Sequence, residues 1–310
     1  MVKYYVMLEF RNVSLDLKPV VDKYYNKYGE GSCQHSFAAS FCLQSKYSDR
    51  FCEKDNVLYI NREGLSNNEY KAFLFPMCDR NDKELIKTAI DNIVDNAHAE
   101  GKKAILNTIT KECKEIITSI YGDKLSISDC RDYYEYIFEI SKIANLSGSL
   151  FQSKRNKINK LEKEYENRIV ETPITGQDSA LLENFYSEWL KEHGTDNSVV
   201  FENEMKEFRL AIDNFDELKL IGIKITIDGE LAGFNFGSQV NADTYDGMVQ
   251  KGNLKYDGIY ELLNRESAKA WIDKFKYLNF EEDLGIEGLR KAKLLYQPDI
   301  LLEKYIAMEV

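Results

Sequence analysis

Apolar residues recur at helical spacing in one segment of the first half of the chain. They are Leu85, Ile86, Ala89, Ile90, Ile93, Val94 and Ala97. Steps of three and four residues put these side chains on one face of a helix, which Gly101 would end. Shorter runs predict strands over 7–10, 56–60, 70–75, 103–106 and 133–140, and helices over 17–28 and 113–120. This alternation predicts a mixed sheet covered by helices, so the expected fold class is α/β.

The second half has a sharper pattern and begins with a basic helix expected over 150–165, which joins the two halves. The elements expected after it are a strand over 167–171, helices around 182–189 and 205–215, strands over 218–227, 231–236 and 244–250, a helix over 259–271, a strand over 277–280, a helix over 286–296 and a strand over 300–308. The dipeptide Asp228-Gly229 favours the tight turn of a hairpin. This order of elements resembles the GNAT acyltransferase fold.

Length and composition fit two closely packed domains, which we expect over 1–140 and 141–310. The chain has 310 residues, of which 44% are apolar and 30% charged, and only 4 are prolines. The N-terminus lacks the pattern of a signal peptide, and no apolar run of about 18 residues is present. We therefore expect a cytoplasmic protein without a transmembrane segment.

Candidate metal ligands are sparse. The 6 cysteines form no CxxC pair, and the chain has only 3 histidines, including His193. We expect reduced, mostly buried thiols, no zinc or iron site and no catalytic histidine. The net charge of −11 argues against broad, nonspecific nucleic-acid binding and leaves only a local basic patch as a place for phosphates.

Four segments carry a resemblance to a known family. They are Arg131-Asp-Tyr-Tyr-Glu-Tyr-Ile137, Lys154-Arg-Asn-Lys-Ile-Asn-Lys160, Lys255-Tyr-Asp-Gly-Ile-Tyr260, and Asp283-Leu-Gly-Ile-Glu-Gly-Leu-Arg-Lys-Ala-Lys293 with Tyr296-Gln-Pro298. Together they resemble the C-terminal domain of phosphatidylglycerol lysyltransferase over nearly the whole chain. The resemblance implies two tandem GNAT-like domains and kinship with enzymes that move an aminoacyl group from aminoacyl-tRNA to a lipid or peptide. The lipid-modifying relatives also carry a large membrane-spanning part, which is not found in this sequence.

The first candidate site is the loop before the helix expected over 259–271. In acetyl-CoA-dependent GNAT enzymes, the amides of a glycine-containing loop bind pyrophosphate at a helix N-terminus. Gly258 matches the central glycine of that loop, and Lys255 matches its basic residue. However, Tyr260 fills a position that favours a small residue, and Asp257 adds a negative charge. Two interpretations stay open: a donor site at Gly258 and Tyr260, or an ordinary turn that starts a helix.

The second candidate is the basic run of the joining helix, which contains Lys154, Arg155, Asn156, Lys157 and Lys160. At about 100° per residue, Lys154 falls within the apolar stripe of this helix, whereas Lys157 and Lys160 lie away from it. A lysine on the packed side must extend its ammonium to water or meet an anion. The run is either a solvated basic helix or a clamp for the phosphates of tRNA or a cofactor.

The third candidate lies around the last expected helix. Asp283 comes between a strand and that helix, where it either complements the helix dipole or, as the resemblance implies, deprotonates an acceptor amine or orients the donor. Arg290 and Lys293 lie on one helix face, where they hold a phosphate, a terminal adenosine or nearby acids. Tyr296 is either a core residue or the tyrosine that protonates a leaving group in GNAT enzymes. We expect Arg131-Asp132 to form a structural ion pair.

Three functional hypotheses follow. The first is a transferase that moves an acyl or aminoacyl group from an aminoacyl-tRNA-like donor to an amine or hydroxyl of a small molecule, peptide or lipid headgroup. The second is an N-acetyltransferase that uses acyl-CoA, the only cofactor that the sequence suggests. The third is a non-catalytic binding protein that retains the fold. A donor site of the first kind requires a basic cleft formed by Lys154, Arg155, Arg290 and Lys293.

Overall fold

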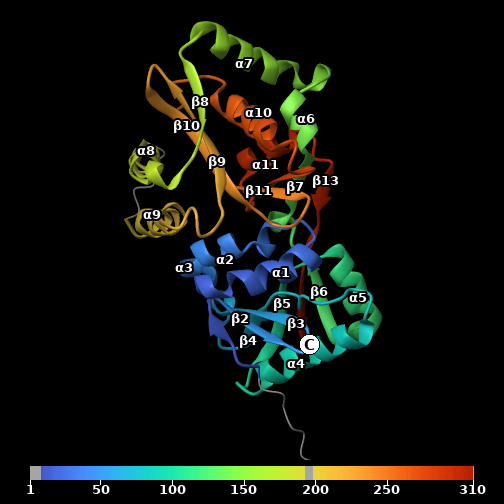
Figure 1. Ribbon diagram of the computed structural model, residues 1–310. Coiled ribbons are helices and arrows are strands. Elements are labelled where there is room, and N and C mark those ends of the chain that lie inside the picture. Colours follow the sequence, from blue (N-terminus) through green and yellow to red (C-terminus); the bar gives the residue numbers. More distant parts are fainter. Residues whose placement is uncertain (1–7, 193–197, 310) are drawn as a thin grey trace, which may run out of the picture. The chain divides into compact units, whose positions relative to one another are not determined.

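The chain forms two compact units in the computed structural model, which describes residues 8–192 and 198–309. Unit 1 is made of the ranges 1–135, 282–290 and 301–310, and unit 2 of the ranges 136–281 and 291–300. Each unit contains one mixed sheet of seven strands with helices packed against it (Figure 1). His193, for which we expected no catalytic role, lies outside the described residues.

Unit 1 has the strand order β1-β2-β3-β4-β5-β14-β6. Its strands are β1 (Arg11–Asn12), β2 (Asp49–Lys54), β3 (Val57–Arg62), β4 (Tyr70–Phe73), β5 (Lys103–Thr110), β6 (Leu125–Asp129) and β14 (Lys304–Glu309). Its helices are α1 (Lys18–Tyr28), α2 (Phe37–Cys42), α3 (Gln44–Tyr47), α4 (Lys83–His98) and α5 (Lys111–Tyr121). The apolar face predicted for α4 is confirmed, because Ile86, Ile90 and Ile93 are buried in the core of this unit.

Unit 2 has the strand order β13-β7-β12-β11-β10-β9-β8. Its strands are β7 (Glu135–Glu139), β8 (Ile169–Pro173), β9 (Ile221–Ile227), β10 (Glu230–Gln239), β11 (Thr244–Gly252), β12 (Tyr277–Glu282) and β13 (Ile300–Leu302). Its helices are α6 (Ile140–Asn145), α7 (Gln152–Glu164), α8 (Ser179–Glu192), α9 (Ser198–Asp213) and α10 (Ile259–Trp271). Helix α11 (Glu287–Leu294) belongs to unit 1 as far as Arg290 and to unit 2 from Lys291 onward. The order of elements expected from 167 onward is therefore confirmed as far as α11, and the hairpin turn lies at Asp228-Gly229 as expected.

The two halves of the sequence exchange one strand each. β14, at the end of the chain, lies between β5 and β6 and is antiparallel to both, and β7 lies between β12 and β13. The single strand expected over 300–308 is therefore wrong, since β13 and β14 belong to different sheets. The strand expected over 133–140 is shorter, because 131–133 form a turn of 3-10 helix.

The remaining differences from expectation concern short elements. The strand expected over 7–10 is not confirmed: Met7 lies outside the described residues, 8–10 are not in a strand, and β1 begins at Arg11. The sequence does not predict α2, α3 or α6, because helices of four to six residues are too short to show a 3.6-residue period. It also misses β2, where four of the six residues are charged.

Strands β11 and β12 of unit 2 pair over a short distance only. They are parallel at three residue pairs, which run from Thr244 to Asp246 on β11 and from Tyr277 to Asn279 on β12. Beyond this point β11 continues to Gly252 in register with β10 alone. The β10–β11 register also shifts between Phe236 and Ser238, which places one extra residue on β11. Such bulges often lie next to functional sites because they redirect side chains.

Candidate functional site

Several polar side chains of unit 2 lie near the end of β11. On one face of β11, Lys251 lies opposite Phe234 of β10, whose ring contacts Phe185 of α8. The Nζ of Lys251 lies 4.1 Å from the ring centroid of Trp189 and 5.0 Å from that of Tyr186, both on α8. Lys251 therefore meets the faces of two aromatic rings, where a cation is attracted by the π electrons.

Burial lowers the pKa of the Lys251 amine, while the charges of Glu204 and Glu281 act to raise it. Within the described part of the chain, Lys251 forms no ion pair. Glu204 of α9 instead accepts a hydrogen bond of 2.5 Å from the Tyr186 hydroxyl. An amine held this way loses its proton more easily than a surface lysine, because the charged form is less well solvated.

On the opposite face of β11, a chain of hydrogen bonds runs from Gln250 to Tyr296. The Gln250 amide donates to Asn264 of α10 over 2.8 Å, and the Asn264 amide donates to the Tyr296 hydroxyl over 2.9 Å. Lys154 of α7 places its Nζ 3.6 Å from the centroid of the Tyr296 ring. The helical projection is confirmed: Lys154 is 9% exposed, and it meets a ring face rather than an anion. Burial lowers the pKa of Lys154 and raises that of Tyr296.

The start of α10 lies against α7, and Gly258 is required there for packing. Its φ of 99° is left-handed, and a Cβ at this position would lie 2.9 Å from the backbone oxygen of Lys157. Lys157 also forms an ion pair of 2.9 Å with Glu261, and Lys160 forms one of 3.4 Å with Asp257. These two lysines of α7 are thus already paired with acids, whereas Lys255 of the turn places its Nζ 5.2 Å from the centroid of the Tyr256 ring. These contacts favour the interpretation of the loop as a turn that starts a helix.

The other predicted donor residues of unit 2 have local contacts. The Tyr260 hydroxyl accepts a hydrogen bond of 3.2 Å from the Trp189 indole and donates one of 3.3 Å to the carbonyl of Gly252. Tyr260 therefore connects the end of β11 to the rings around Lys251. Arg155 donates to the carbonyls of Leu146 and Gly148, whereas Asn156 is exposed and accepts from Gln152. Arg155 thus stabilises the loop before α7.

Asp283 is the centre of an ion-pair cluster in unit 1. Its carboxylate is fully buried and accepts hydrogen bonds from Arg290 Nη2 at 2.7 Å, Arg290 Nε at 2.9 Å and Arg131 Nη1 at 3.1 Å. The backbone amide of Gly285 donates a further bond of 2.9 Å, and Arg290 also contacts Asp132 at 2.7 Å. The hydrogen bond to Asp283 is the main reason that the pKa of Arg290 is raised. Arg131 and Asp132 each form an ion pair here, but Arg131 pairs with Asp283 and Asp132 pairs with Arg290.

The predicted site residues separate into two groups. Lys154, Tyr296 and Tyr260 lie with the polar residues of unit 2, and Lys293 lies in the same unit, with its Nζ 5.9 Å from the centroid of the Tyr136 ring. Asp283 and Arg290 belong to unit 1. The structure thus gives Arg155 and Arg290 local partners, and the basic cleft expected from four cations stays a prediction.

Sequence reasoning missed Lys251, Asn264 and Gln250. Gln250 and Lys251 are polar residues at the end of a strand and directly precede Gly252, which was the available signal. Asn264 lies on the buried face of α10, where a polar residue among Leu262 and Leu263 indicates a buried hydrogen bond.

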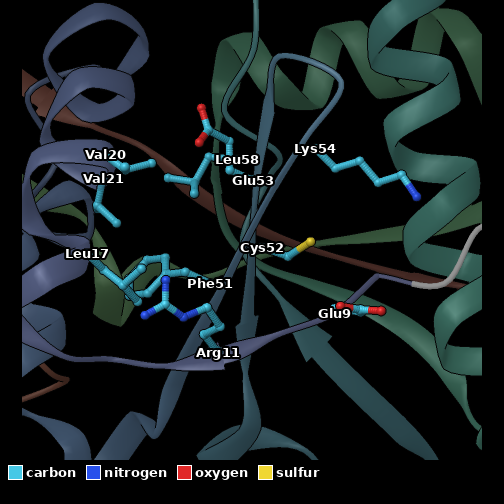
Figure 2. A pocket seen from close by; sticks show the side chains of 10 residues that line it. All are labelled: Glu9, Arg11, Leu17, Val20, Val21, Phe51, Cys52, Glu53, Lys54 and Leu58. Carbon is cyan, nitrogen blue, oxygen red and sulfur yellow. The ribbon is translucent and has the colours of Figure 1, made fainter.

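A cavity of about 420 Å³ lies in unit 1, between α1 and the strands β1, β2 and β3 (Figure 2). Leu17, which directly precedes α1, and Val21 of α1 line one side of it, whereas Lys54 and Glu9 lie on the other side of the β2–β3 hairpin and point away from them. Two of its charged residues have local partners: Arg11 pairs with Asp16 at 2.6 Å, and Glu53 pairs with Lys23 at 3.8 Å. None of the site residues predicted from the sequence lines this cavity.

The described residues contain no cluster of histidine, cysteine, aspartate and glutamate side chains that could hold a metal ion. None of the six cysteines, all of which are described, takes part in a disulfide bond, and five of them are buried. No helix in the described ranges is long and apolar enough to cross a membrane.

Comparison with known proteins gives the relationship of the whole chain. The family described as "Phosphatidylglycerol lysyltransferase, C-terminal" matches residues 25–308. The chain belongs to this family. A curated member of the wider group of relatives, an uncharacterized protein of Mycoplasmoides gallisepticum, is 23% identical over 171 residues, which are 55% of this chain and 54% of that protein. The chain thus matches about half the length of this curated relative.

Solved structures share the fold of the chain. A conserved protein of unknown function from Bacteroides thetaiotaomicron is 29% identical, with a TM-score of 0.91 over 98% of this chain and 100% of that chain. L-PGS from Bacillus licheniformis has a TM-score of 0.65 at 13% identity over 96% and 93% of the two chains, and FemX one of 0.66 at 8% identity over 98% of both. The expected fold class is confirmed: α/β, with two tandem GNAT-like domains in this lysyltransferase C-terminal family.

Proposed function

We propose that the chain moves an aminoacyl group from an aminoacyl-tRNA-like donor to an amine or hydroxyl acceptor, at the end of β11 in unit 2. The observation that carries this proposal is the opening between β11 and β12 beyond Asp246 and Asn279, where β11 presents Gln250 and Lys251 on its two faces. In open α/β sheets, ligands bind beyond the carboxyl ends of parallel strands. Membership of a family named for a lysyltransferase supports the same reaction class.

The start of α10 favours an aminoacyl-tRNA-like donor over acyl-CoA. A CoA pyrophosphate would require cations and bare amides at this turn. Here Lys157 and Lys160 are paired with Glu261 and Asp257, and the carbonyl of Lys157 packs against Gly258. Lys154 has no carboxylate partner in the described chain and lies beside Tyr296, so it is the cation of α7 that we assign to the donor.

The transfer requires no covalent intermediate. Holding an ester and an acceptor at reacting distance supplies much of the rate acceleration, and one proton must be removed from the acceptor. We assign a positioning role to Tyr296, whose hydroxyl is already bound by Asn264, whereas the Asp283 carboxylate in unit 1 is bound by Arg131 and Arg290. That either residue exchanges a proton with substrate stays a prediction.

Filter binding of labelled aminoacyl-tRNA tests the proposal. We expect retention that uncharged tRNA displaces poorly and acetyl-CoA does not displace, and that weakens as salt rises, because phosphate contacts release counterions. Displacement by acetyl-CoA together with no retention of tRNA at low salt would instead assign the second hypothesis, an acyl-CoA-dependent acetyltransferase. Absence of both forms of binding would leave the non-catalytic binding protein.

A further inference from the structure

Lys251 differs from Lys157 and Lys160 in the groups that its amine contacts. Lys157 and Lys160 face carboxylates on the surface, at 2.9 and 3.4 Å. The Nζ of Lys251 instead faces the rings of Trp189 and Tyr186. A lysine in such surroundings is costly to bury, and groups of this kind concentrate at functional sites.

The location of Lys251 adds a second, geometric argument. It lies on the part of β11 that β12 does not pair, next to Gly252, whose carbonyl accepts the hydrogen bond from Tyr260. The same Tyr260 hydroxyl accepts from the Trp189 indole, so the wall of rings around Lys251 is tied to the strand. This arrangement fixes the amine where the sheet opens.

We propose that Lys251 is the group that carries protons between the acceptor amine and the leaving hydroxyl during aminoacyl transfer. The proposal rests on the transferase function proposed above. In this role Lys251 touches the reacting atoms, so it is a catalytic residue rather than a positioning residue.

The reaction starts from an acceptor ammonium and an aminoacyl ester. Neutral Lys251 Nζ takes a proton from the ammonium, and the resulting amine forms a C–N bond to the ester carbonyl carbon. The C–O bond to the ribose oxygen then breaks, and that oxygen leaves with the electron pair and takes the proton back from Lys251. The second proton of the attacking nitrogen passes to Lys251 and then to water, which leaves an amide and a tRNA hydroxyl.

The charged and titratable groups around Lys251 set the direction of its pH response. They are Tyr186 on α8, Glu204 on α9, Tyr260 on α10 and Glu281 on β12. Burial outweighs the two carboxylates, so the pKa of Lys251 is lowered. Because the neutral amine is the active form, we expect the transfer rate to rise with pH up to the pKa of Lys251 and to level off above it.

Competitive acetylation tests the state of Lys251 without any acceptor. Trace acetic anhydride labels neutral amines, and mass spectrometry of the full-length protein after digestion gives the labelling of each lysine against pH. We expect the midpoint of Lys251 to lie below the usual lysine value of about 10.4. Lys274, an exposed lysine of unit 2 whose Nζ lies 5.0 Å from the centroid of the Phe275 ring, is the reference for reagent access. Aminoacyl-tRNA should reduce the labelling of Lys251 several-fold more than uncharged tRNA does.

Two variants test the proton transfer itself. Lys251→Arg keeps the charge but does not release a proton at accessible pH, and Lys251→Met keeps only the apolar stem. With ethylamine as the acceptor probe, we expect both variants to discharge labelled aminoacyl-tRNA about 10²-fold or more slowly than wild type, to lose the rising limb of the pH profile, and to bind the tRNA normally. The matched control Lys274→Arg should retain the wild-type rate and pH profile.

Different results would overturn the role of Lys251 and the transferase function on which it rests. Wild-type discharge together with an unchanged rate and pH profile in Lys251→Arg would overturn the role of Lys251 and leave the transferase in place. A labelling midpoint at the usual lysine value, or no protection by a bound aminoacyl-tRNA, would overturn it even where a variant fails to fold. Failure of the wild-type protein to bind aminoacyl-tRNA would overturn both proposals.

Discussion

The charged residues of this chain differ in the groups that their side chains contact. The sequence predicts only some of these contacts. The helical projection predicts that Lys154 lies on the packed side of its helix, and it does. Its partner, the ring of Tyr296, could not be predicted because the two residues are 142 positions apart and no local pattern links them. Asp283 was singled out by resemblance alone, and its two arginine partners come from distant and neighbouring segments.

Replacing Asp283 tests the structural role of its cluster. Asp283→Asn removes a fully buried carboxylate and leaves Arg131 and Arg290 without their shared partner. We expect the melting temperature to fall by about 5 °C or more. The control is Asp228→Asn, which removes a surface ion pair with Arg168 and should change it little. Equal effects of the two substitutions in calorimetry would contradict the structural role.

Glu30 of unit 1 gives a prediction about pH. It accepts a hydrogen bond of 2.7 Å from Thr110, and burial raises the pKa of its carboxyl group. Since this pKa is higher in the folded state, the stability that Glu30 contributes is present at low pH and is lost as pH rises through the folded-state value. Glu30→Gln should therefore raise the melting temperature by about 2–4 °C near neutral pH and less at about pH 4.

Thermal unfolding of Glu30→Gln at several pH values, beside the exposed control Glu115→Gln, measures this difference. An increase in melting temperature that is largest in acid and vanishes toward neutral pH would contradict this prediction.

At the scale of helices and strands, the sequence predicts the long elements and misses the short ones. The helices α4, α5, α7 and α10 are long enough for apolar residues to repeat at helical spacing, and all four were expected. The helices α2, α3 and α6 have four to six residues each and show no period. The sequence pattern of a strand also does not show which strand pairs with it. The pairing of β11 with β12, which ends early and defines the proposed site, is therefore seen only in the structure.

Gly258 links the start of α10 to α7 and can be tested directly. Gly258→Ala forces a side chain into a left-handed backbone conformation and against the carbonyl of Lys157. We expect the free energy of unfolding to fall by about 2 kcal/mol or more. The matched control is Gly288→Ala in α11, where nothing lies within 4 Å of the added Cβ, and alanine should be neutral or slightly stabilising. Urea titrations in which Gly258→Ala is as stable as Gly288→Ala would refute the packing role.

For the whole molecule, the main feature is that each half of the sequence completes the sheet of the other unit. β14 follows β13 after one residue but belongs to a different sheet, and β7 precedes α6 but lies among strands of the second half. The patterns of these strands predict their existence and not their neighbours, because side-chain periodicity reports which faces are buried, not which strand lies alongside. The domain boundary expected between 140 and 141 follows sequence order. It therefore places β7 in the first domain and β14 in the second, whereas the two sheets contain these strands the other way round.

Deleting residues 303–310 tests the exchange. The deletion removes β14 from between β5 and β6 and leaves the fully buried Glu135 without Lys304, which lies 2.6 Å away. We expect amide hydrogens of β5 and β6 to lose most of their protection in hydrogen exchange, while those of β9 and β10 in unit 2 remain protected. Retained protection in β5 would contradict the assignment of β14 to this sheet.

The central claim is that unit 2 binds an aminoacyl-tRNA-like donor, and the most direct measurement is the affinity for charged against uncharged tRNA in three proteins. These are the wild type, Lys154→Met, and Lys163→Met as an exposed control on the same helix. We expect wild type and Lys163→Met to bind the charged form more tightly, and Lys154→Met to lose about tenfold or more of this affinity without loss of folding. Equal binding of charged and uncharged tRNA, or a Lys154→Met variant that binds as wild type does, would contradict it.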